Sequence, residues 1–353
     1  MSSQSIDELH ARPLVSVAVS TYKRAQTIRC MLDGLKRQTY KNFELVIVLK
    51  PSGDGTEKIL ERYAADLPIN LVLQKKCSIT NAYNLAIKNS KGEIIVFLDD
   101  DAVPCPNLLE AYVKTYNKYE DVGAISGPAE SASIKDGKIV QVPKPAVKRV
   151  RHYEFPWSRP LNGLSDWLIY FGKDGLVHHR QLLKKGKVEA IYPSFLFMGA
   201  NMSFKKDAIE GLSFDENNFL GFTCEQIFSY KIWRRGYNLL YNPEARVLHL
   251  IQDDTLGRFY KKPKKAALRD AEFVLSFPFV RSHENISVIA YSLAILTILF
   301  AYILNMRRYG LSILLHRIYG LFYGFVVACA LVISHSSGGN FSKINALAGL
   351  YEQ

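Results

Sequence analysis

The strongest constraint on the fold is a regular alternation of strand and helix patterns along the first half of the chain. Short runs rich in β-branched residues alternate with segments whose apolar residues recur at helical spacing. This order is typical of α/β domains, in which parallel strands form a central sheet with helices on both faces. The expected strands are Val15–Ser20, Phe43–Leu49, Ile69–Leu73, Glu93–Leu98 and Val122–Ser126, and the expected helices are Ala25–Gln38, Thr56–Ala65, Ile79–Asn89 and Leu108–Tyr119.

Three consecutive aspartates, Asp99, Asp100 and Asp101, follow the expected strand Glu93–Leu98. Open parallel sheets bind ligands just beyond the carboxyl ends of their strands. Adjacent carboxylates repel one another, and a hard divalent cation that also contacts substrate phosphates would neutralise them. The pattern therefore favours a metal and phosphate site. The alternative interpretation is an acidic turn that caps the next helix.

The regular pattern weakens after Val122–Ser126. Ser131–Lys187 combines prolines, basic residues and aromatics without periodicity, which is typical of a functional or mobile segment. Regularity returns further on, with Phe195–Phe204, a helix at Glu225–Arg235, and strands at Leu239–Tyr241 and Ala245–Leu250.

The chain has 353 residues and a net charge of +12, with basic clusters within residues 144–151, 184–187 and 261–265. Such clusters suit anionic membrane surfaces, phosphorylated ligands or nucleic acid. No recognisable nucleic-acid-binding module accompanies them, so we expect no nucleic-acid partner.

The five scattered cysteines lack a Cys-x-x-Cys pair, which argues for reduced thiols rather than disulfides or zinc. Met1–Pro13 is polar and lacks the apolar core of a secretory signal.

The C-terminal third is apolar. Ile286–Leu304 carries no charge and is long enough to cross a hydrocarbon core of ~30 Å. A second apolar stretch starts at Leu311, so we expect two membrane helices, with buried core helices as the alternative. Because Arg307 and Arg308 connect the two, a shallow hairpin with an interfacial segment is a further alternative. Ala266–His283 mixes charged and apolar residues, which predicts an amphipathic helix on the membrane surface.

Four segments together resemble the motifs of family 2 glycosyltransferases, in the family's order. They are Val15–Arg24, Glu93–Asp101 with an Asp-x-Asp pattern, Phe197–Met202 with Gly-Ala-Asn, and Thr223–Tyr237. The resemblance covers residues 14–250 and implies a GT-A fold, Rossmann-like with a mostly parallel sheet, that uses a nucleotide-sugar donor and Mn²⁺ or Mg²⁺. It implies a tail at 1–13, a catalytic domain at 14–255, a basic lid loop and interfacial helix at 256–284, membrane helices at 285–335 and a tail at 336–353.

The resemblance also implies roles for individual residues. Asp101 and His249 would bind the metal, although a lone histidine at a strand end is often structural. Glu225 would be the general base of an inverting reaction, and the alternative is a charge that favours a helix N-terminus. The donor-binding set is Thr21, Tyr22, Arg24, Asp54, Asn84, Asp99 and Asp100, and the set for the acceptor or diphosphate region is Gly199, Ala200, Asn201 and Lys261.

The sequence departs from the family pattern at three places. Cys224 replaces the first acidic residue of the usual Glu-Asp pair, the turn after Leu49 lacks the usual acidic position, and Tyr83 stands where arginine is common. Because of these changes, the resemblance does not identify the nucleotide base of the donor.

The expected function is an inverting, membrane-anchored transferase acting on a lipid-linked acceptor, such as a polyprenyl or dolichyl phosphate or a glycolipid, at the cytoplasmic face of the cell membrane. Mannose from GDP-mannose is the first hypothesis. A UDP-sugar, a metal-dependent nucleotidyltransferase and a non-catalytic membrane scaffold are the alternatives.

Overall fold

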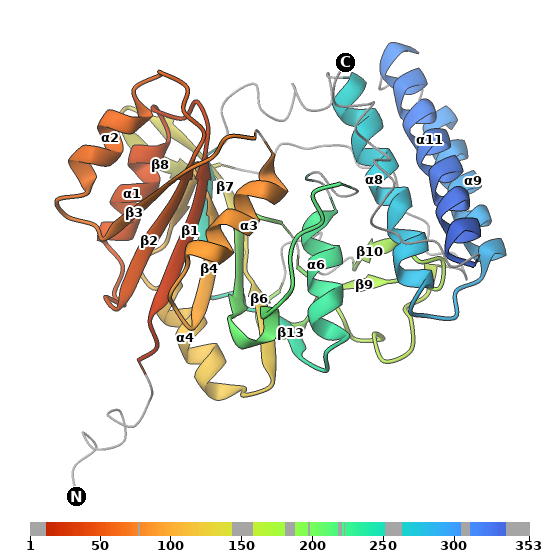
Figure 1. Ribbon diagram of the computed structural model, residues 1–353, viewed down its shortest axis with the longest axis horizontal. Helices are drawn as coiled ribbons and strands as arrows, with labels where there is room; N and C mark the ends of the chain where they lie inside the picture. Colours follow the sequence, from red (N-terminus) through yellow and green to blue (C-terminus); the bar gives the residue numbers. More distant parts are fainter. Residues whose placement is uncertain are drawn as a thin grey trace, which may run out of the picture. The chain divides into compact units, whose positions relative to one another are not determined.

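The computed structural model describes residues 12–76, 78–142, 158–180, 188–196, 198–217, 221, 223–250, 263–304 and 311–336 (Figure 1). The chain divides into two compact units. The sheet unit comprises Met1–Pro143, Val188–Phe214 and Phe228–Leu250, and the helical unit comprises Lys144–Lys187, Asp215–Ile227 and Ile251–Gln353. Two segments that we predicted to be part of the catalytic domain, 144–187 and 215–227, therefore group with the C-terminal helices.

The sheet unit contains an eight-stranded, mostly parallel sheet, as the alternation of patterns predicts. Pairs β1/β2, β2/β3, β1/β4 and β6/β13 are parallel, whereas β12 runs antiparallel to both β4 and β6. The strand order is β11-β13-β6-β12-β4-β1-β2-β3. The strands are β1 (Val15–Thr21), β2 (Phe43–Leu49), β3 (Ile69–Leu73), β4 (Ile94–Asp99), β6 (Val122–Ser126), β11 (Tyr192–Pro193), β12 (Asn201–Lys205) and β13 (Asn238–Tyr241).

The register of the central strands brings three loops to one edge of the sheet. Thr21 at the end of β1 pairs with Leu49 at the end of β2, and Ser20 pairs with Asp99 at the end of β4. The loops that follow these three strands therefore start side by side, which places the acidic triplet next to the residues after Thr21.

The helices of the sheet unit bury the apolar faces that their sequences predict. In α1 (Ile28–Lys36), Ile28, Met31, Leu32 and Leu35 recur at helical spacing and are fully buried. The Ser78 hydroxyl accepts a hydrogen bond from the Asn81 N–H and caps the start of α3. The remaining described helices are α2 (Thr56–Tyr63), α3 (Ile79–Asn89), α4 (Leu108–Lys118) and the 3₁₀ turn η4 (Asp207–Ile209). Helix α6 (Cys224–Trp233) belongs to this unit from Phe228 onward and to the helical unit before it.

A second, four-stranded sheet was not predicted from the sequence. Its order is β5-β14-β7-β8, with β5 (Ala102–Pro104), β7 (Ala129–Lys135), β8 (Lys138–Gln141) and β14 (Val247–Leu250). We expected no regular structure from Ser131 onward, but β7 and β8 form a hairpin. Asp136 and Gly137 both have positive φ, at 49° and 71°, as the turn of a tight hairpin requires. The Asp-Gly dipeptide was the sequence signal that would have revealed this turn.

The short strand β5 also decides between two interpretations of the acidic triplet. It begins at Ala102, directly after Asp101, and the next helix starts only at Leu108. The triplet therefore does not cap a helix, and the alternative interpretation is wrong.

The described residues of the helical unit include α8 (Pro263–Arg281), α9 (Val288–Leu304), α11 (Leu311–Ser336) and a hairpin of β9 (Ile169–Phe171) and β10 (Val177–His179). Added Cβ atoms at Gly320 and Gly324 of α11 would lie 2.2 Å and 2.9 Å from backbone atoms of Ala267 and Ala271 of α8. Small residues four apart thus let the two helices approach closely.

A buried ion pair joins the same helices. The Arg317 Nε of α11 donates to the Asp270 Oδ2 of α8 at 2.9 Å, and the guanidinium lies 4.0 Å from the centre of the Tyr302 ring of α9. Because removing one member of a buried pair leaves an uncompensated charge, this contact specifies how the three helices pack.

Helix α8 does not have the exposed face that an amphipathic surface helix needs. All of its described side chains are buried or half-buried, including Asp270, Glu272 and Phe277. The prediction of an interfacial helix at Ala266–His283 is therefore corrected: α8 is a buried helix of its unit.

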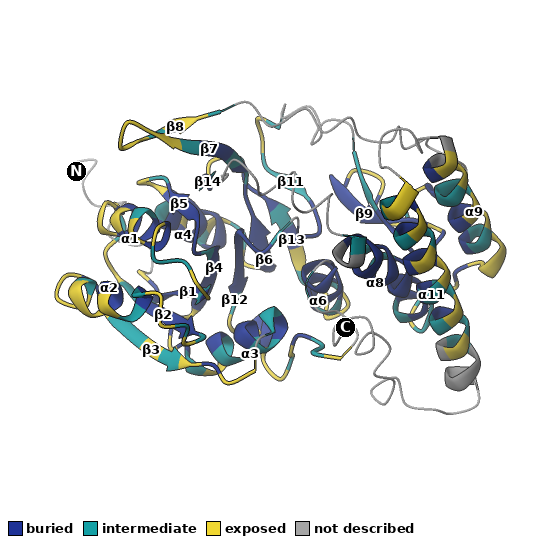
Figure 2. Cartoon of the chain, turned by 90° about the horizontal axis from the view of Figure 1, so that it is seen from above, coloured by how far each residue is buried: buried dark blue, intermediate teal, exposed yellow. Residues whose placement is uncertain are grey.

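Helices α9 and α11 carry many exposed residues (Figure 2), and a series of these residues is apolar. Within α11, the stretch Leu311–Ala330 is long and apolar enough to cross a membrane, whereas α9 contributes only the shorter apolar helix Val288–Phe300. By length, the described residues thus offer one such helix where we expected two. The exposed apolar residues are Val288, Ile289, Leu293, Leu296, Phe300 and Ile303 on α9, and Leu311, Leu315, Tyr319, Phe322 and Val326 on α11.

Candidate active site

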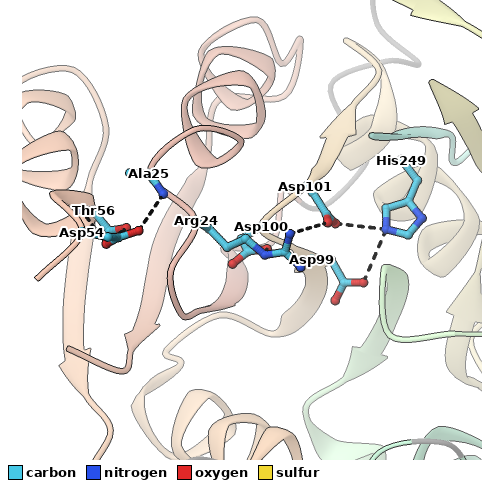
Figure 3. Close-up of polar contacts among 8 residues, drawn as sticks. All are labelled: Arg24, Ala25, Asp54, Thr56, Asp99, Asp100, Asp101 and His249. Carbon is cyan, nitrogen blue, oxygen red and sulfur yellow. Dashed lines mark hydrogen bonds and ion pairs between the residues drawn. The ribbon is translucent and has the colours of Figure 1, made fainter. Parts of the chain in front are cut away.

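Two carboxylates and an imidazole of the sheet unit converge beyond the end of β4 (Figure 3). The His249 Nε2 lies 3.0 Å from the Asp101 Oδ1 and 3.9 Å from the Asp99 Oδ2. One ligand atom from each of the three residues lies within 4.8 Å of the others. The oxygen and imidazole donors fit a hard or borderline divalent cation such as Mg²⁺ or Mn²⁺.

The second sheet places His249 in this cluster. In β14, His249 pairs with Ala102 of β5, the residue that directly follows Asp101. The Leu250 N–H also donates to the Asp101 backbone oxygen at 2.8 Å. The metal-ligand role of His249 stays a prediction, but the structure brings its side chain to the predicted partner.

Arg24, in the loop after β1, supplies a positive charge to the triplet. Its Nε lies 3.3 Å from the Asp100 Oδ1, and its Nη1 lies 3.5 Å from the Asp101 Oδ2. About a third of the Arg24 side chain is exposed, so the guanidinium also reaches solvent. An arginine in this position can bind phosphate oxygens with its remaining donors.

The three aspartates differ in proton affinity because their surroundings differ. Burial and the charge of Asp101 raise the pKa of Asp99 to about 6, although about a third of its side-chain surface stays open. Burial raises the pKa of Asp100 to about 7, against the opposing charge of Arg24. Burial opposes ionisation of Asp101 too, but the hydrogen bond and charge of His249 outweigh it and lower its pKa. Asp101 is thus the carboxylate that the protein itself keeps ionised.

Asp54 organises the loops around Arg24. Its carboxylate accepts hydrogen bonds from the Ala25 N–H, the Ser52 hydroxyl, and the N–H and hydroxyl of Thr56. Slight burial opposes the charge, but these hydrogen bonds lower the pKa of Asp54 to about 2. The structure therefore gives Asp54 a role in holding the loop after Arg24, and its predicted donor contact stays a prediction.

Asn201 is fully buried, and its amide connects the two sheets. The Nδ2 donates to the backbone oxygens of Pro128 and Ala245 at 3.1 Å and 2.7 Å, and the Oδ1 accepts from the Tyr112 hydroxyl at 2.6 Å. Gly127 permits this junction, because an added Cβ would lie 1.9 Å from the Ala245 oxygen. The side chain of Asn201 thus helps to place the segment that leads into β14 and His249. Sequence reasoning missed Tyr112 and Gly127, since neither belongs to a recognisable motif.

The other predicted residues lie in different settings. The Asn84 amide exchanges two hydrogen bonds with the Phe214 backbone, at 3.0 Å and 2.8 Å. Thr21 is buried beside Asp100, and Tyr22 is 41% exposed. Gly199 and Ala200 form the turn before β12, and their predicted acceptor or diphosphate role is untested. Lys261 and the basic clusters at 144–151 and 184–187 lie outside the described residues.

Glu225 belongs to the helical unit and is the second residue of α6. It is 6% exposed and sits in the first turn of the helix, where the helix dipole favours a negative charge. Burial, then the charges of Glu225 and Glu272, raise the pKa of the neighbouring Cys224 thiol well above its usual value. This placement fits both the predicted base and the predicted alternative, a charge at a helix N-terminus.

The mixed α/β sheet, with an acidic triplet and a histidine beyond one strand end, resembles the fold of GT-A glycosyltransferases. Residues 16–163 match the family described as glycosyl transferase family 2, and this match includes the acidic triplet and Arg24.

Relatives and solved structures agree with this assignment. An uncharacterized glycosyltransferase of Rickettsia prowazekii is 34% identical over 113 residues, which are 32% of this chain and 35% of that protein. The chain thus spans about a third of the length of such curated relatives.

Two solved structures share the fold. A mannosyltransferase of Pyrobaculum calidifontis in complex with GDP-Man and Mn²⁺ has a TM-score of 0.51 and 19% identity, covering 97% of this chain and 79% of that one. GalNAc-T7 with UDP, GalNAc and Mn²⁺ has a TM-score of 0.52 and 15% identity, covering 74% and 51%.

Proposed function

We propose that this protein is an inverting, metal-dependent glycosyltransferase that moves a sugar from a nucleoside diphosphate sugar to a lipid-linked acceptor. The observation that carries the proposal is the convergence of Asp99, Asp101 and His249 in a family 2 domain. A divalent cation held there would stabilise the negative charge that develops on the leaving diphosphate.

The residues around the cluster have complementary tasks. Asp101 and His249 would hold the cation, and Asp99 would contact the donor ribose. Arg24 adds a positive charge next to the phosphates. Thr21, at the end of β1, and Tyr22, in the loop that carries Arg24, would contact the donor.

Glu225 acts on the acceptor. It takes the proton from the acceptor hydroxyl, whose oxygen attacks the anomeric carbon while the bond to the diphosphate breaks on the opposite face. This in-line displacement inverts the anomeric configuration.

The proposal also names a sugar donor and a membrane location. Mannose from GDP-mannose is supported by the similarity in fold to the Pyrobaculum calidifontis enzyme, whose complex holds GDP-Man and Mn²⁺. GalNAc-T7, which binds UDP and GalNAc, has a comparable TM-score, so a UDP-sugar is the second candidate. The exposed apolar faces of α9 and α11 support anchoring in a membrane, which we place with the catalytic domain on the cytoplasmic side.

A thermal-shift screen of the detergent-solubilised chain tests the donor. We expect one nucleotide sugar to raise the melting temperature only with Mn²⁺ or Mg²⁺, because a ligand that binds the folded state stabilises it. Asp101→Asn should abolish this response. Asp66→Asn, at an exposed aspartate paired with Lys36, is the matched control and should keep it. No response of the wild type to any donor would refute the proposal.

A transfer assay with a lipid-linked acceptor separates the remaining classes. Glu225→Gln should retain donor binding and lose transfer. Full turnover of Glu225→Gln would instead favour a nucleotidyltransferase, which needs no base on an acceptor sugar. A wild type that shows no metal-dependent binding of any nucleotide sugar would favour a scaffold.

A further inference from the structure

A second buried carboxylate, Glu272 of α8, lies against the backbone that leads into α6. Its side chain is fully buried. The Oε2 accepts hydrogen bonds from the N–H groups of Gly221 and Thr223, at 3.4 Å and 3.3 Å. Neither the family motifs nor the mechanism above gives Glu272 a task.

The two donors belong to the start of the helix that carries Glu225. The Ile227 N–H donates to the Thr223 oxygen, so Thr223 is the residue that flanks the start of α6 at Cys224. Gly221 has a φ of 153°, which favours glycine. Glu272 therefore holds the backbone at Gly221 and Thr223 in a specific conformation, and Glu225 follows only two residues after Thr223.

The energetics favour a persistent contact. A buried carboxylate is costly unless hydrogen bonds satisfy it, and here backbone N–H groups and the positive end of a helix do so. Releasing the loop would leave Glu272 buried with fewer partners, so the contact resists local opening.

Helix α8 links this contact to the rest of the helical unit. Asp270 and Glu272 are two residues apart, so their side chains leave the helix in nearly opposite directions, about 200° apart. Asp270 binds Arg317 of α11 at 2.9 Å, and Glu272 binds the loop before α6. The helix thus lies between α11 and the loop of Glu225, with a charged contact on each side.

We propose that Glu272 is a positioning residue that fixes the backbone before α6 and thereby orients Glu225 toward the acceptor. The inference rests on the proposed function of Glu225 as general base. It assigns to the apolar C-terminal helices a role in catalysis in addition to anchoring, because they hold α8 in place.

Three substitutions in the full chain test this proposal. Glu272→Met keeps the side-chain volume and removes the acceptor oxygen. Glu272→Gln keeps an acceptor oxygen without the charge. Ser276→Ala is the matched control, because Ser276 is buried one turn further along α8 and bonds to the Gly175 oxygen at 3.1 Å rather than to the loop.

The kinetic readout separates positioning from general damage. We expect Glu272→Met to lower kcat on the order of 100-fold, the effect typical of a misplaced catalytic group. The donor KM and the metal-dependent thermal shift should stay at wild-type values. Glu272→Gln should recover most of the lost kcat, and Ser276→Ala should retain it. Equal kcat for Glu272→Met and Ser276→Ala would overturn the proposal.

Hydrogen exchange measured by mass spectrometry tests the contact without any turnover. Glu272→Met should speed exchange at residues 221–227 by at least tenfold, whereas Ser276→Ala should not. Unchanged exchange there would refute the contact. If the wild type transfers no sugar, the proposed function fails while the exchange result still decides whether Glu272 holds the loop.

Discussion

Replacing Asn201 by alanine should destabilise the sheet unit because it removes the amide that joins the two sheets. The change deletes three hydrogen bonds, to Tyr112, Pro128 and Ala245. The Pro128 oxygen keeps the Val247 N–H as a partner. The buried Tyr112 hydroxyl and the Ala245 oxygen each lose the only partner described for them, and each such loss costs about 1–3 kcal/mol. We therefore expect Asn201→Ala to lower the free energy of unfolding by about 2–6 kcal/mol.

Urea unfolding of the detergent-solubilised chain, followed by circular dichroism, measures this loss. Ser203→Ala is the matched control, because Ser203 is equally buried in β12 and bonds to Tyr116 and to the Ile125 oxygen. Both variants should lose stability. Only Asn201→Ala should also weaken the Mn²⁺-dependent thermal shift and speed hydrogen exchange in β14, since only Asn201 contacts the segment that leads to His249.

The reasoning is refuted if Asn201→Ala costs less than about 1 kcal/mol, the net value of a single hydrogen bond. It is also refuted if exchange in β14 is the same in both variants.

Three further predictions concern the site and the helices. Asp101→Asn should remove the Mn²⁺ stabilisation measured by thermal shift, which for wild type amounts to about 2.7 kcal/mol at a metal concentration 100 times the dissociation constant. The lowered pKa of Asp54 means that its charge stabilises the fold above its unfolded-state pKa of 3.8, and that this stabilisation is lost as the pH falls toward about 2. The melting temperature of wild type minus that of Asp54→Asn should therefore be constant above pH 3.8 and shrink below it, and a difference independent of pH would contradict this. Gly320→Leu should destabilise the helical unit by about 1–3 kcal/mol in thermal unfolding, because it overpacks the contact with Ala267. Ala330→Leu, on the exposed side of α11, should have no such effect.

Local patterns in the sequence were sufficient for most elements of the sheet unit. The predicted ranges Phe43–Leu49, Ile69–Leu73, Ile79–Asn89 and Val122–Ser126 are those of the structure. Strand and helix differ in the period with which apolar residues recur, and a buried sheet enforces that period over each segment. The Asp-Gly turn between β7 and β8 was missed because the residues around it lack such a period.

Local patterns failed where burial is decided by distant residues. The charges on α8 suggested a surface helix. In the structure, Asp270 forms an ion pair with Arg317 of α11, and Glu272 accepts hydrogen bonds from the backbone before α6. A buried charge with a partner far along the chain has the same local sequence as an exposed one.

The sequence by itself determined the order of strands and helices, the acidic triplet at the end of β4 and the family motifs. The family resemblance grouped His249 and Arg24 with the triplet, but only the tertiary structure shows how their side chains reach it. His249 is 148 residues from Asp101 and reaches it because β14 pairs with β5. Arg24 reaches it because β1 and β4 are neighbours in register. Residue spacing along the chain carries the local periods, whereas contacts between distant residues depend on strand pairing, which no local pattern in the sequence reveals.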